Sequence, residues 1–208
     1  MSIVLHHHPR TRAANVLWFL EEVGCEYTLE FVELEQGAHK TTAFKTLNPM
    51  GKVPTLVDGD VVLAEVAAIG MYLADKYAPG RLAPALDAPQ RAPYLRWICY
   101  GPSVIEPGCM AKAANWEFKP LTAGWGTYEE MLETIDAAIG DGPFLLGENF
   151  SMADMLFGGT VGWMMKFGML PKKPAWEAYI ERLEARPARQ KARALNAAVA
   201  AEHGLDLG

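Results

Sequence analysis

One stretch of the chain decides its fold, and it reads Asn48-Pro49-Met50-Gly51-Lys52-Val53-Pro54-Thr55-Leu56-Val57-Asp58-Gly59-Asp60-Val61-Val62-Leu63-Ala64-Glu65. Residues 55–57 and 61–64 are two apolar runs rich in β-branched side chains, and Asp-Gly-Asp separates them. Asp and Gly tolerate the positive φ angles that tight turns need. The stretch therefore predicts a hairpin of two short antiparallel strands.

The residues at the two ends of this hairpin suggest a binding site. Pro54 stands directly before the first strand, and an X-Pro bond is the one peptide bond for which the cis form costs little. In that form the backbone N–H and C=O of Val53 would face outward, where an extended ligand can pair with them. Glu65 ends the second strand and opens a helix, which sets a carboxylate beside exposed N–H donors.

The order of these parts resembles the cytosolic glutathione S-transferase family, in its bacterial serine/threonine-type branch. The resemblance rests on Asn-Pro-Met-Gly-Lys-Val-Pro-Thr-Leu, on the hairpin after it, and on Leu63-Ala64-Glu65 leading into Ala67-Ala68-Ile69-Gly70-Met71-Tyr72-Leu73. It implies that Pro54 is cis and that the chain before it binds the backbone of glutathione. The alternative, a buried hairpin with ordinary turn prolines, accounts for the apolar residues but not for the whole ordered set.

The composition predicts a globular, soluble protein of the cytoplasm. Of the 208 residues, 50% are hydrophobic and 21% charged, and the net charge of -6 argues against nucleic acid or an anionic membrane as a main partner. No apolar run approaches the roughly 18 residues of a membrane helix, and no leader pattern is expected. The three cysteines are expected to be reduced thiols. No metal site is expected at His6-His7-His8, because neighbouring side chains of a strand point to opposite faces.

The first part of the chain alternates strand and helix patterns. The expected elements are strands at residues 2–5 and 27–34, the hairpin, and helices at 11–24, 42–47 and 66–77. The first helix begins at about Thr11 and stops at Gly24, a residue that suits the left-handed end of a helix. The pattern alone predicts a small α/β sandwich. The resemblance implies a thioredoxin-like, glutathione-binding domain over residues 1–78.

The chain after a linker at residues 79–89 is expected to be helical. The linker holds three prolines and a glycine, which forbid a sustained helix. Helices are expected at 90–105, with a kink or break at Pro102 and Pro107, and at 125–139, 175–185 and 188–201. Ser151 and Asp154 predict a capping box that starts a further helix. The resemblance implies that this is the core helix of an all-helical domain over residues 90–208. The predicted fold is therefore α/β plus all-α, a thioredoxin-like domain followed by a helical one.

The start of the first helix is the expected place of the chemistry. A glutathione-dependent enzyme must lower the pKa of the glutathione thiol, and a hydroxyl with free N–H groups at a helix N-terminus stabilises the thiolate. Thr11-Arg12 matches the family's serine-type pattern with Thr in place of Ser. The resemblance therefore implies that Thr11 donates to the thiolate and that Arg12 orients glutathione or attracts anions. Two plainer interpretations stay open, in which Thr11 is only an N-cap and Arg12 only a solvated helix residue.

The resemblance implies the remaining glutathione contacts residue by residue. The backbone of Val53 pairs with the cysteinyl part, Glu65 holds the γ-glutamyl ammonium, and the N–H of Val66 holds its carboxylate. The family usually has Ser after this Glu, so Val66 lacks a hydroxyl and one hydrogen bond worth about 0.5–1.5 kcal/mol, or up to about 3 kcal/mol with a charged partner. Its loss should weaken glutathione binding roughly tenfold or more. His39 and Lys52 are candidates for the glycyl carboxylate, although each alone is more often a surface residue.

The second substrate is expected between the domains, beside the helix that follows the linker. Aromatic and methionine side chains there favour a small hydrophobic electrophile, and they can equally belong to the core. The candidates are Tyr100, Ser103, Glu106, Met110 and Trp116.

These residues and the resemblance predict a glutathione transferase, with glutathione as co-substrate and no metal. Glutathione-dependent reduction of disulfides or peroxides is an alternative, because the same thiolate can attack sulfur or oxygen. A non-catalytic protein that keeps the fold to bind a partner is a third possibility, and Val66 is the feature that favours it. The resemblance also implies a homodimer.

Overall fold

The structure is a computed structural model that describes residues 3–140 and 142–207. The contacts of these residues divide the chain into two units, one from Met1–Ala78 with Arg186–Gly208 and the other from Pro79–Ala185. Ser2, the first residue of the first predicted strand, lies outside the described residues.

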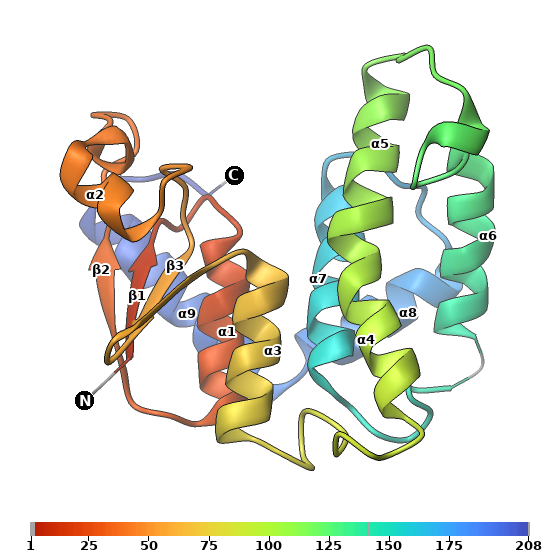
Figure 1. Cartoon of the computed structure of the whole chain (residues 1–208), viewed down its shortest axis with the longest axis horizontal. Coiled ribbons are helices and arrows are strands. Elements are labelled where there is room, and N and C mark those ends of the chain that lie inside the picture. The colour runs from red at the N-terminus through yellow and green to blue at the C-terminus, as the bar shows by residue number, and fades with distance from the viewer. Residues whose placement is uncertain (1–2, 141, 208) are drawn as a thin grey trace. The chain divides into compact units, whose positions relative to one another are not determined.

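The first unit holds a mixed sheet with helices around it. Its elements are β1 (Ile3–His7), α1 (Ala13–Val23), β2 (Tyr27–Phe31), η1 (Ala38–Lys40), α2 (Thr42–Leu47), β3 (Thr55–Asp58), β4 (Val61–Ala64), α3 (Val66–Tyr77) and α9 (Pro187–Glu202). The sheet has the order β2-β1-β3-β4, and Figure 1 labels its first three strands. β1 pairs with β2 in parallel and with β3 antiparallel, and β3 with β4 forms the predicted hairpin. This is the thioredoxin-like topology that we expected.

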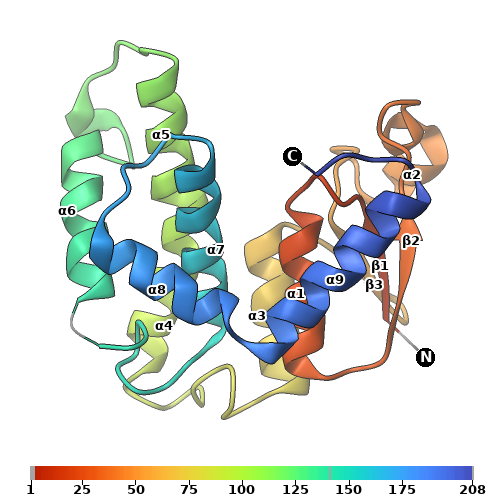
Figure 2. The same cartoon turned by 180° about the vertical axis from the view of Figure 1, so that it is seen from behind.

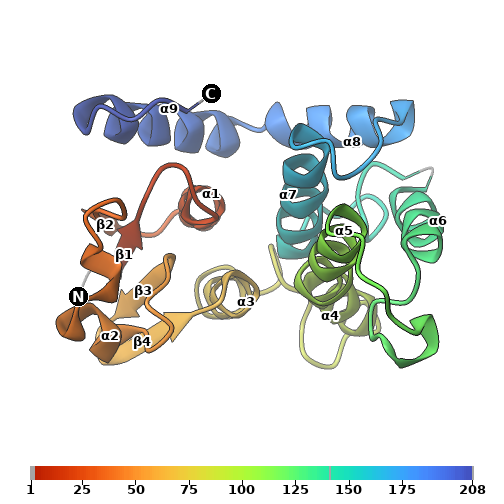
Figure 3. The ribbon, with the colours of Figure 1, turned by 90° about the horizontal axis from the view of Figure 1, so that it is seen from above.

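Burial along β1 shows which face of the sheet carries the core. Leu5 and His7 are buried, whereas Val4 and His6 between them are only half-buried, as the alternation of a strand requires. α1 and α3 lie side by side on one side of the sheet (Figure 3). α1 ends at Gly24, whose φ of 78° is the left-handed conformation predicted for the helix stop.

The C-terminal helix α9 belongs to the first unit by its contacts. It runs along α1 (Figure 2), and its Ala192 and Ala200 are buried. Pro187 is its first residue, where a missing N–H costs no intrahelical bond. The contacts thus place α9 with the sheet, while the domain boundaries drawn from the sequence, 1–78 and 90–208, stay a prediction.

The second unit is helical. Its elements are α4 (Arg91–Tyr100), η2 (Gly101–Ile105), α5 (Glu106–Ala113), η3 (Pro120–Thr122), α6 (Tyr128–Ile139), α7 (Met152–Lys166) and α8 (Pro174–Glu184). η2 is a π-helical segment, and the N–H of Glu106 bonds back to the carbonyl of Gly101. Pro102 and Pro107 lie in first-turn positions of η2 and α5. The predicted break at the prolines does not occur, because α4, η2 and α5 follow one another without a gap. The helix is widened locally in the π segment, where the missing N–H groups of the prolines are tolerated.

The predicted capping box at the start of α7 is confirmed. The backbone N–H and the hydroxyl of Ser151 lie 2.9 and 3.0 Å from Asp154 Oδ2. Asp154 is fully buried, and its other oxygen accepts from the Leu145 N–H at 2.8 Å and from the Tyr179 hydroxyl at 3.0 Å. The linker joins this core as well, because the N–H of Met152 donates to the carbonyl of Leu82 at 2.9 Å.

Candidate functional site

The register of the sheet brings the predicted glutathione-binding segments to one end of the first unit. His6 pairs with Thr55 across β1 and β3, and Thr55 pairs with Ala64 across β3 and β4. The segment that leaves β1, the one that enters β3 and the one that leaves β4 therefore meet at the same end of the sheet. These segments carry Thr11, Val53-Pro54 and Glu65, respectively.

Thr11 stands in the turn between β1 and α1, and its hydroxyl is bonded within that turn. Its Oγ1 donates to the carbonyl of His8 at 2.8 Å and accepts from the N–H of Ala13 at 3.1 Å. α1 begins at Ala13 and not at about Thr11 as predicted, so the N-cap position belongs to Arg12, which makes no side-chain cap, while the Thr11 hydroxyl still accepts from the first N–H of the helix. Thr11 is also half-exposed, and Arg12 beside it is exposed. Because a hydroxyl has one proton, Thr11 can donate to a ligand only when it gives up the bond to His8.

The bond between Val53 and Pro54 is cis, as predicted. Among the residues that the structure describes, none exchanges a backbone hydrogen bond with Val53. The neighbouring carbonyl of Lys52 is held from inside, by Asn48 Nδ2 at 2.9 Å and by the Thr55 hydroxyl at 3.0 Å. Asn48 and Thr55 are buried, so they fix the segment while leaving the Val53 backbone for a partner.

Glu65 adopts a backbone conformation that non-glycine residues rarely occupy. Its φ is 66° and its ψ is 117°. Such a conformation costs about 1–3 kcal/mol and is found mainly where function requires it. Glu65 is exposed and makes no capping bond with its side chain, and Val66 begins α3 behind it. Glu65 therefore stands directly before the first N–H groups of α3, which have no acceptor within the helix.

Positive charge gathers near η1. Partial burial lowers the pKa of His39, and the nearby charges of Lys40 and Lys52 lower it further. The effect of Lys52 on the pKa of His39 is consistent with an electropositive region that includes both residues predicted to bind the glycyl carboxylate. A neutral His39 can still donate one hydrogen bond to a carboxylate.

Lys40 is a supporting residue that the sequence analysis missed. Its Nζ donates to the carbonyls of Met50 and Gly51 at 3.0 and 2.8 Å. Gly51 has a φ of 57°, and a Cβ there would stand 2.5 Å from the His39 carbonyl oxygen. Only glycine therefore lets η1 approach the loop before Val53 so closely. The Gly51-Lys52 pair was visible in the sequence, but its partner at position 40 was not.

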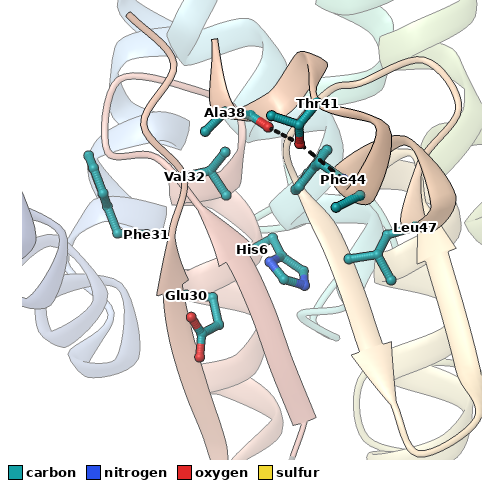
Figure 4. A pocket seen from close by; sticks show the side chains of 9 residues that line it. His6, Glu30, Phe31, Val32, Ala38, Thr41, Phe44 and Leu47 are labelled. Atoms are coloured by element: carbon teal, nitrogen blue, oxygen red, sulfur yellow. Dashed lines mark hydrogen bonds between the residues drawn. The ribbon is translucent and has the colours of Figure 1, made fainter. Parts of the chain in front are cut away.

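A pocket of about 320 Å³ lies on the half-buried face of the sheet (Figure 4). It is lined by His6, Glu30, Phe31, Val32, Ala38, Thr41, Ala43, Phe44 and Leu47. Thr41 Oγ1 shapes one wall, because it donates to the Ala38 carbonyl at 2.9 Å and accepts from the Phe44 N–H at 3.2 Å. None of the residues predicted to bind glutathione lines this pocket, so it is separate from the predicted site.

The residues predicted to bind the electrophile lie along one helical run of the second unit. They are Tyr100 at the end of α4, Ser103 in η2, Glu106 and Met110 in α5, and Trp116 after it. None of these five residues is buried. Met110 is 48% and Trp116 58% exposed. Tyr100 is the most enclosed by aromatic rings, and its ring centroid lies 5.5 Å from that of Trp97 and 6.2 Å from that of Phe157.

In residues 3–140 and 142–207, no group of three or more His, Cys, Asp or Glu side chains is arranged to hold a metal ion. No helix in that part of the chain has the length and apolar character needed to cross a membrane.

Comparison with known proteins gives the family. The family model of the glutathione S-transferase N-terminal domain matches residues 1–75, and that of the C-terminal domain matches residues 113–190. Glutathione S-transferase 3 of Zea mays is 31% identical over 192 residues, which are 85% of this chain and 86% of the relative. A theta class glutathione S-transferase from Xanthomonas axonopodis pv. citri, solved with glutathione bound, is 32% identical with a TM-score of 0.72, over 92% of this chain and 96% of that one. A glutathione transferase from Methylococcus capsulatus is 28% identical with a TM-score of 0.76, over 94% and 99%. This chain therefore belongs to the glutathione S-transferase family.

Proposed function

We propose that the protein is a glutathione transferase of the serine/threonine type, which joins the glutathione thiolate to a small hydrophobic electrophile. The observation that carries the proposal is the sheet register, which brings Thr11, the unpaired Val53 backbone and Glu65 to one end of the sheet. The Xanthomonas relative, 32% identical over nearly the whole chain, is a glutathione-bound transferase and supports the same assignment.

In this proposal the ligand is held by groups of the first unit. The cysteinyl backbone of glutathione pairs with the N–H and C=O of Val53, next to the cis Pro54. The γ-glutamyl ammonium binds the Glu65 carboxylate, and its carboxylate accepts from the N–H of Val66 at the start of α3, where unpaired donors favour an anion. The glycyl carboxylate lies in the electropositive region of His39 and Lys52.

Thr11 acts on the sulfur. The thiol releases its proton to solvent, and the Thr11 hydroxyl exchanges the His8 carbonyl for the thiolate as its acceptor. A hydrogen bond to an ionised acceptor is roughly twice as strong as one between neutral groups, so the exchange favours the thiolate. The sulfur then attacks an electrophilic carbon. A C–S bond forms, and the electron pair leaves with a halide or passes to the group that activates an alkene.

The electrophile is placed beside the helical run from Tyr100 to Trp116. Tyr100, Met110 and Trp116 offer apolar surface, while Ser103 and Glu106 offer polar groups at the same run. Arg12, exposed at the start of α1, attracts the anionic co-substrate. We also propose that the protein is a homodimer, that it lies in the cytoplasm and that the reaction needs no metal.

Calorimetric titration with reduced glutathione tests the proposal. We expect a dissociation constant between micromolar and low millimolar for the natural chain. Glu65→Gln should weaken binding at least about tenfold, since a hydrogen bond to a charged group contributes about 1.5–3 kcal/mol. Glu26→Gln is the matched control, because Glu26 is exposed in the same unit and outside the site.

Each other result leads to a different function. No binding at about 10 mM, weaker than about 3 kcal/mol of standard free energy, would reject the glutathione site and favour a non-catalytic protein. Binding with turnover of disulfides or peroxides but of no carbon electrophile would favour the reductase. Equal affinities of the Glu65 variant and the Glu26 control would show that the γ-glutamyl group binds elsewhere.

A further inference from the structure

The C-terminal helix α9 is fixed in register on α1, beside the turn that carries Thr11 (Figure 2). Arg186 Nε and Nη2 bind the two carboxylate oxygens of Glu22 at 2.5 and 3.0 Å. One turn further, the Arg189 guanidinium lies 4.8 Å from the centre of the Trp18 ring. The Glu22 side chain is only 6% exposed, so this ion pair is well shielded from solvent.

α9 reaches the turn itself through Asn196. The side-chain Nδ2 donates to the carbonyl of Pro9 at 3.2 Å. Because a carbonyl can only accept, the amide nitrogen must face Pro9, and Oδ1 points away from it. The next carbonyl upstream is that of His8, which receives the Thr11 hydroxyl at 2.8 Å. Asn196 and Thr11 therefore bind adjacent carbonyls of one turn.

The other side of Asn196 meets the buried ring of His7. Burial lowers the pKa of His7 to about 4, against a smaller opposing effect of Asn196. Asn196 Oδ1 and both ring nitrogens of His7 are buried, and within the described chain none has a hydrogen-bond partner of normal geometry. Buried polar groups in this condition are unfavourable for folding. The hydrogen bond from Asn196 to the Pro9 carbonyl is therefore the interaction that accounts for an amide side chain at this position.

We propose that Asn196 is a positioning residue of the transferase reaction, which holds the Pro9 carbonyl and so orients the turn that presents the Thr11 hydroxyl to glutathione. The inference rests on the proposed function. No atom of α9 needs to touch the ligand, because the effect passes through the backbone of Pro9 and His8. A reacting group misplaced by about 1 Å can lose a large part of its effect, so the turn must be held firmly.

Two variants separate the donor of Asn196 from its acceptor. Asn196→Leu keeps the size of the side chain and removes both polar atoms. Asn196→Asp keeps an oxygen toward His7, replaces the donor to Pro9 with an acceptor and adds a negative charge. Gln190→Leu is the matched control, since Gln190 is an exposed amide on the same helix.

Hydrogen exchange of the free protein is the first measurement. The Thr11 N–H bonds to the His8 carbonyl at 3.2 Å and so reports on the order of the turn. We expect its exchange to become at least about threefold faster in both Asn196 variants and to stay unchanged in the Gln190 control. Unchanged exchange in both Asn196 variants would overturn the inference.

The pKa of the thiol of bound glutathione is the second measurement. Both Asn196 variants should raise it by about half a unit to one unit, which is about three- to tenfold less thiolate at a given pH. The glutathione KM should stay within about twofold, and kcat should fall with the thiolate fraction. Faster exchange with an unchanged thiol pKa would overturn the inference, because Asn196 would then order the turn without aiding the chemistry.

A double variant shows whether the effect passes through Thr11. In a Thr11→Val background, Asn196→Leu should add nothing to the thiol pKa, whereas an added shift would overturn the inference. Should Asn196→Leu unfold, Asn196→Ala carries the test, because it removes the donor without adding a charge. Failure of the proposed function is seen separately, when the natural chain binds no glutathione. The inference fails alone when the natural chain binds and ionises glutathione and the Asn196 variants do so equally well.

Discussion

Thr11 and Ser151 both stand at the start of a helix, yet their hydroxyls have different surroundings. Ser151 is 2% exposed, and it bonds to Asp154, whose carboxylate is fully buried and also bound by Leu145 and Tyr179. Thr11 is half-exposed, and the residue three positions on is Ala14, which offers no carboxylate. Its hydroxyl meets only backbone groups.

The difference separates a hydroxyl that serves the fold from one that can serve a ligand. Every hydrogen-bonding atom of the Ser151 box is committed to the second unit, so nothing remains for a substrate. The Thr11 hydroxyl bonds a single carbonyl that it can exchange for a stronger acceptor. A hydroxyl at a helix start thus serves the fold where a buried carboxylate binds it, as at Ser151. It can bind a ligand where no carboxylate follows, as at Thr11.

Removing the Asp154 carboxylate from the Ser151 capping box should have the largest effect on stability. Asp154→Ala leaves the donors of Ser151, Leu145 and Tyr179 buried without an acceptor, at about 1–3 kcal/mol each, so the free energy of unfolding should fall by about 3–5 kcal/mol. Denaturant unfolding measures it. Glu130→Ala is the control, because Glu130 forms the exposed capping box of α6 with Thr127 and should cost much less. Equal losses would show that burial does not distinguish the two boxes.

Acid should destabilise the unit that carries Thr11 through His7. The pKa of His7 is about 4 in the folded protein and about 6.5 when unfolded, because burial disfavours the charged ring. The unfolded chain therefore binds the extra proton between pH 6.5 and 4, and the free energy of unfolding should fall by about 2–3 kcal/mol as the pH drops through that window. His7→Asn should flatten this part of the stability curve. A curve of unchanged slope in the variant would contradict the assignment.

Exchanging the two hydroxyls for apolar groups tests the comparison itself. Thr11→Val should lower turnover about tenfold, or about 1.4 kcal/mol, with the glutathione KM within about twofold. Ser151→Ala should lower the free energy of unfolding by about 1–2 kcal/mol and leave the turnover of the folded protein unchanged. Steady-state kinetics and unfolding on both variants give the result. Lost turnover in the Ser151 variant at full folding would refute the division of roles.

Val66→Ser should have the smallest effect, and it should be a gain. The added hydroxyl restores the hydrogen bond that the family usually has, worth about 0.5–1.5 kcal/mol, so glutathione should bind about three- to tenfold more tightly. Ala67→Ser, one position along α3, is the matched control. Calorimetry that finds equal affinities for both variants would mean that the γ-glutamyl carboxylate does not lie at the start of α3.

Local patterns predicted much of the fold because their causes are local. The hairpin at 55–64, the stop at Gly24 and the box at Ser151 each depend on residues within a few positions. The cis bond before Pro54 was implied by the family resemblance and is confirmed. Thr127-x-x-Glu130 is a capping box of the same kind that the sequence also displayed, and we did not predict it. As a result the predicted start of α6, Trp125, lies three residues before the observed one, Tyr128.

The supports of the candidate site could not be predicted from the sequence. Thr11 was selected from its place before a helix, but its acceptor, the His8 carbonyl, leaves no trace in residue types. Asn196 contacts Pro9 across 187 positions of sequence. Lys40 binds two carbonyls that any residues could supply. Contacts to the backbone and contacts over long separations depend on the folded arrangement, which periodicity and motifs do not encode.

The most direct test of the account is an ultraviolet titration of the thiolate of glutathione bound to the natural chain and to Thr11→Val. If the Thr11 hydroxyl donates to glutathione, the thiol bound to the natural chain has a pKa below the roughly 8.5 of a free cysteine. Thr11→Val then raises it by about one unit. Equal pKa values in the two proteins would contradict the account and leave Thr11, like Ser151, as a residue of the fold.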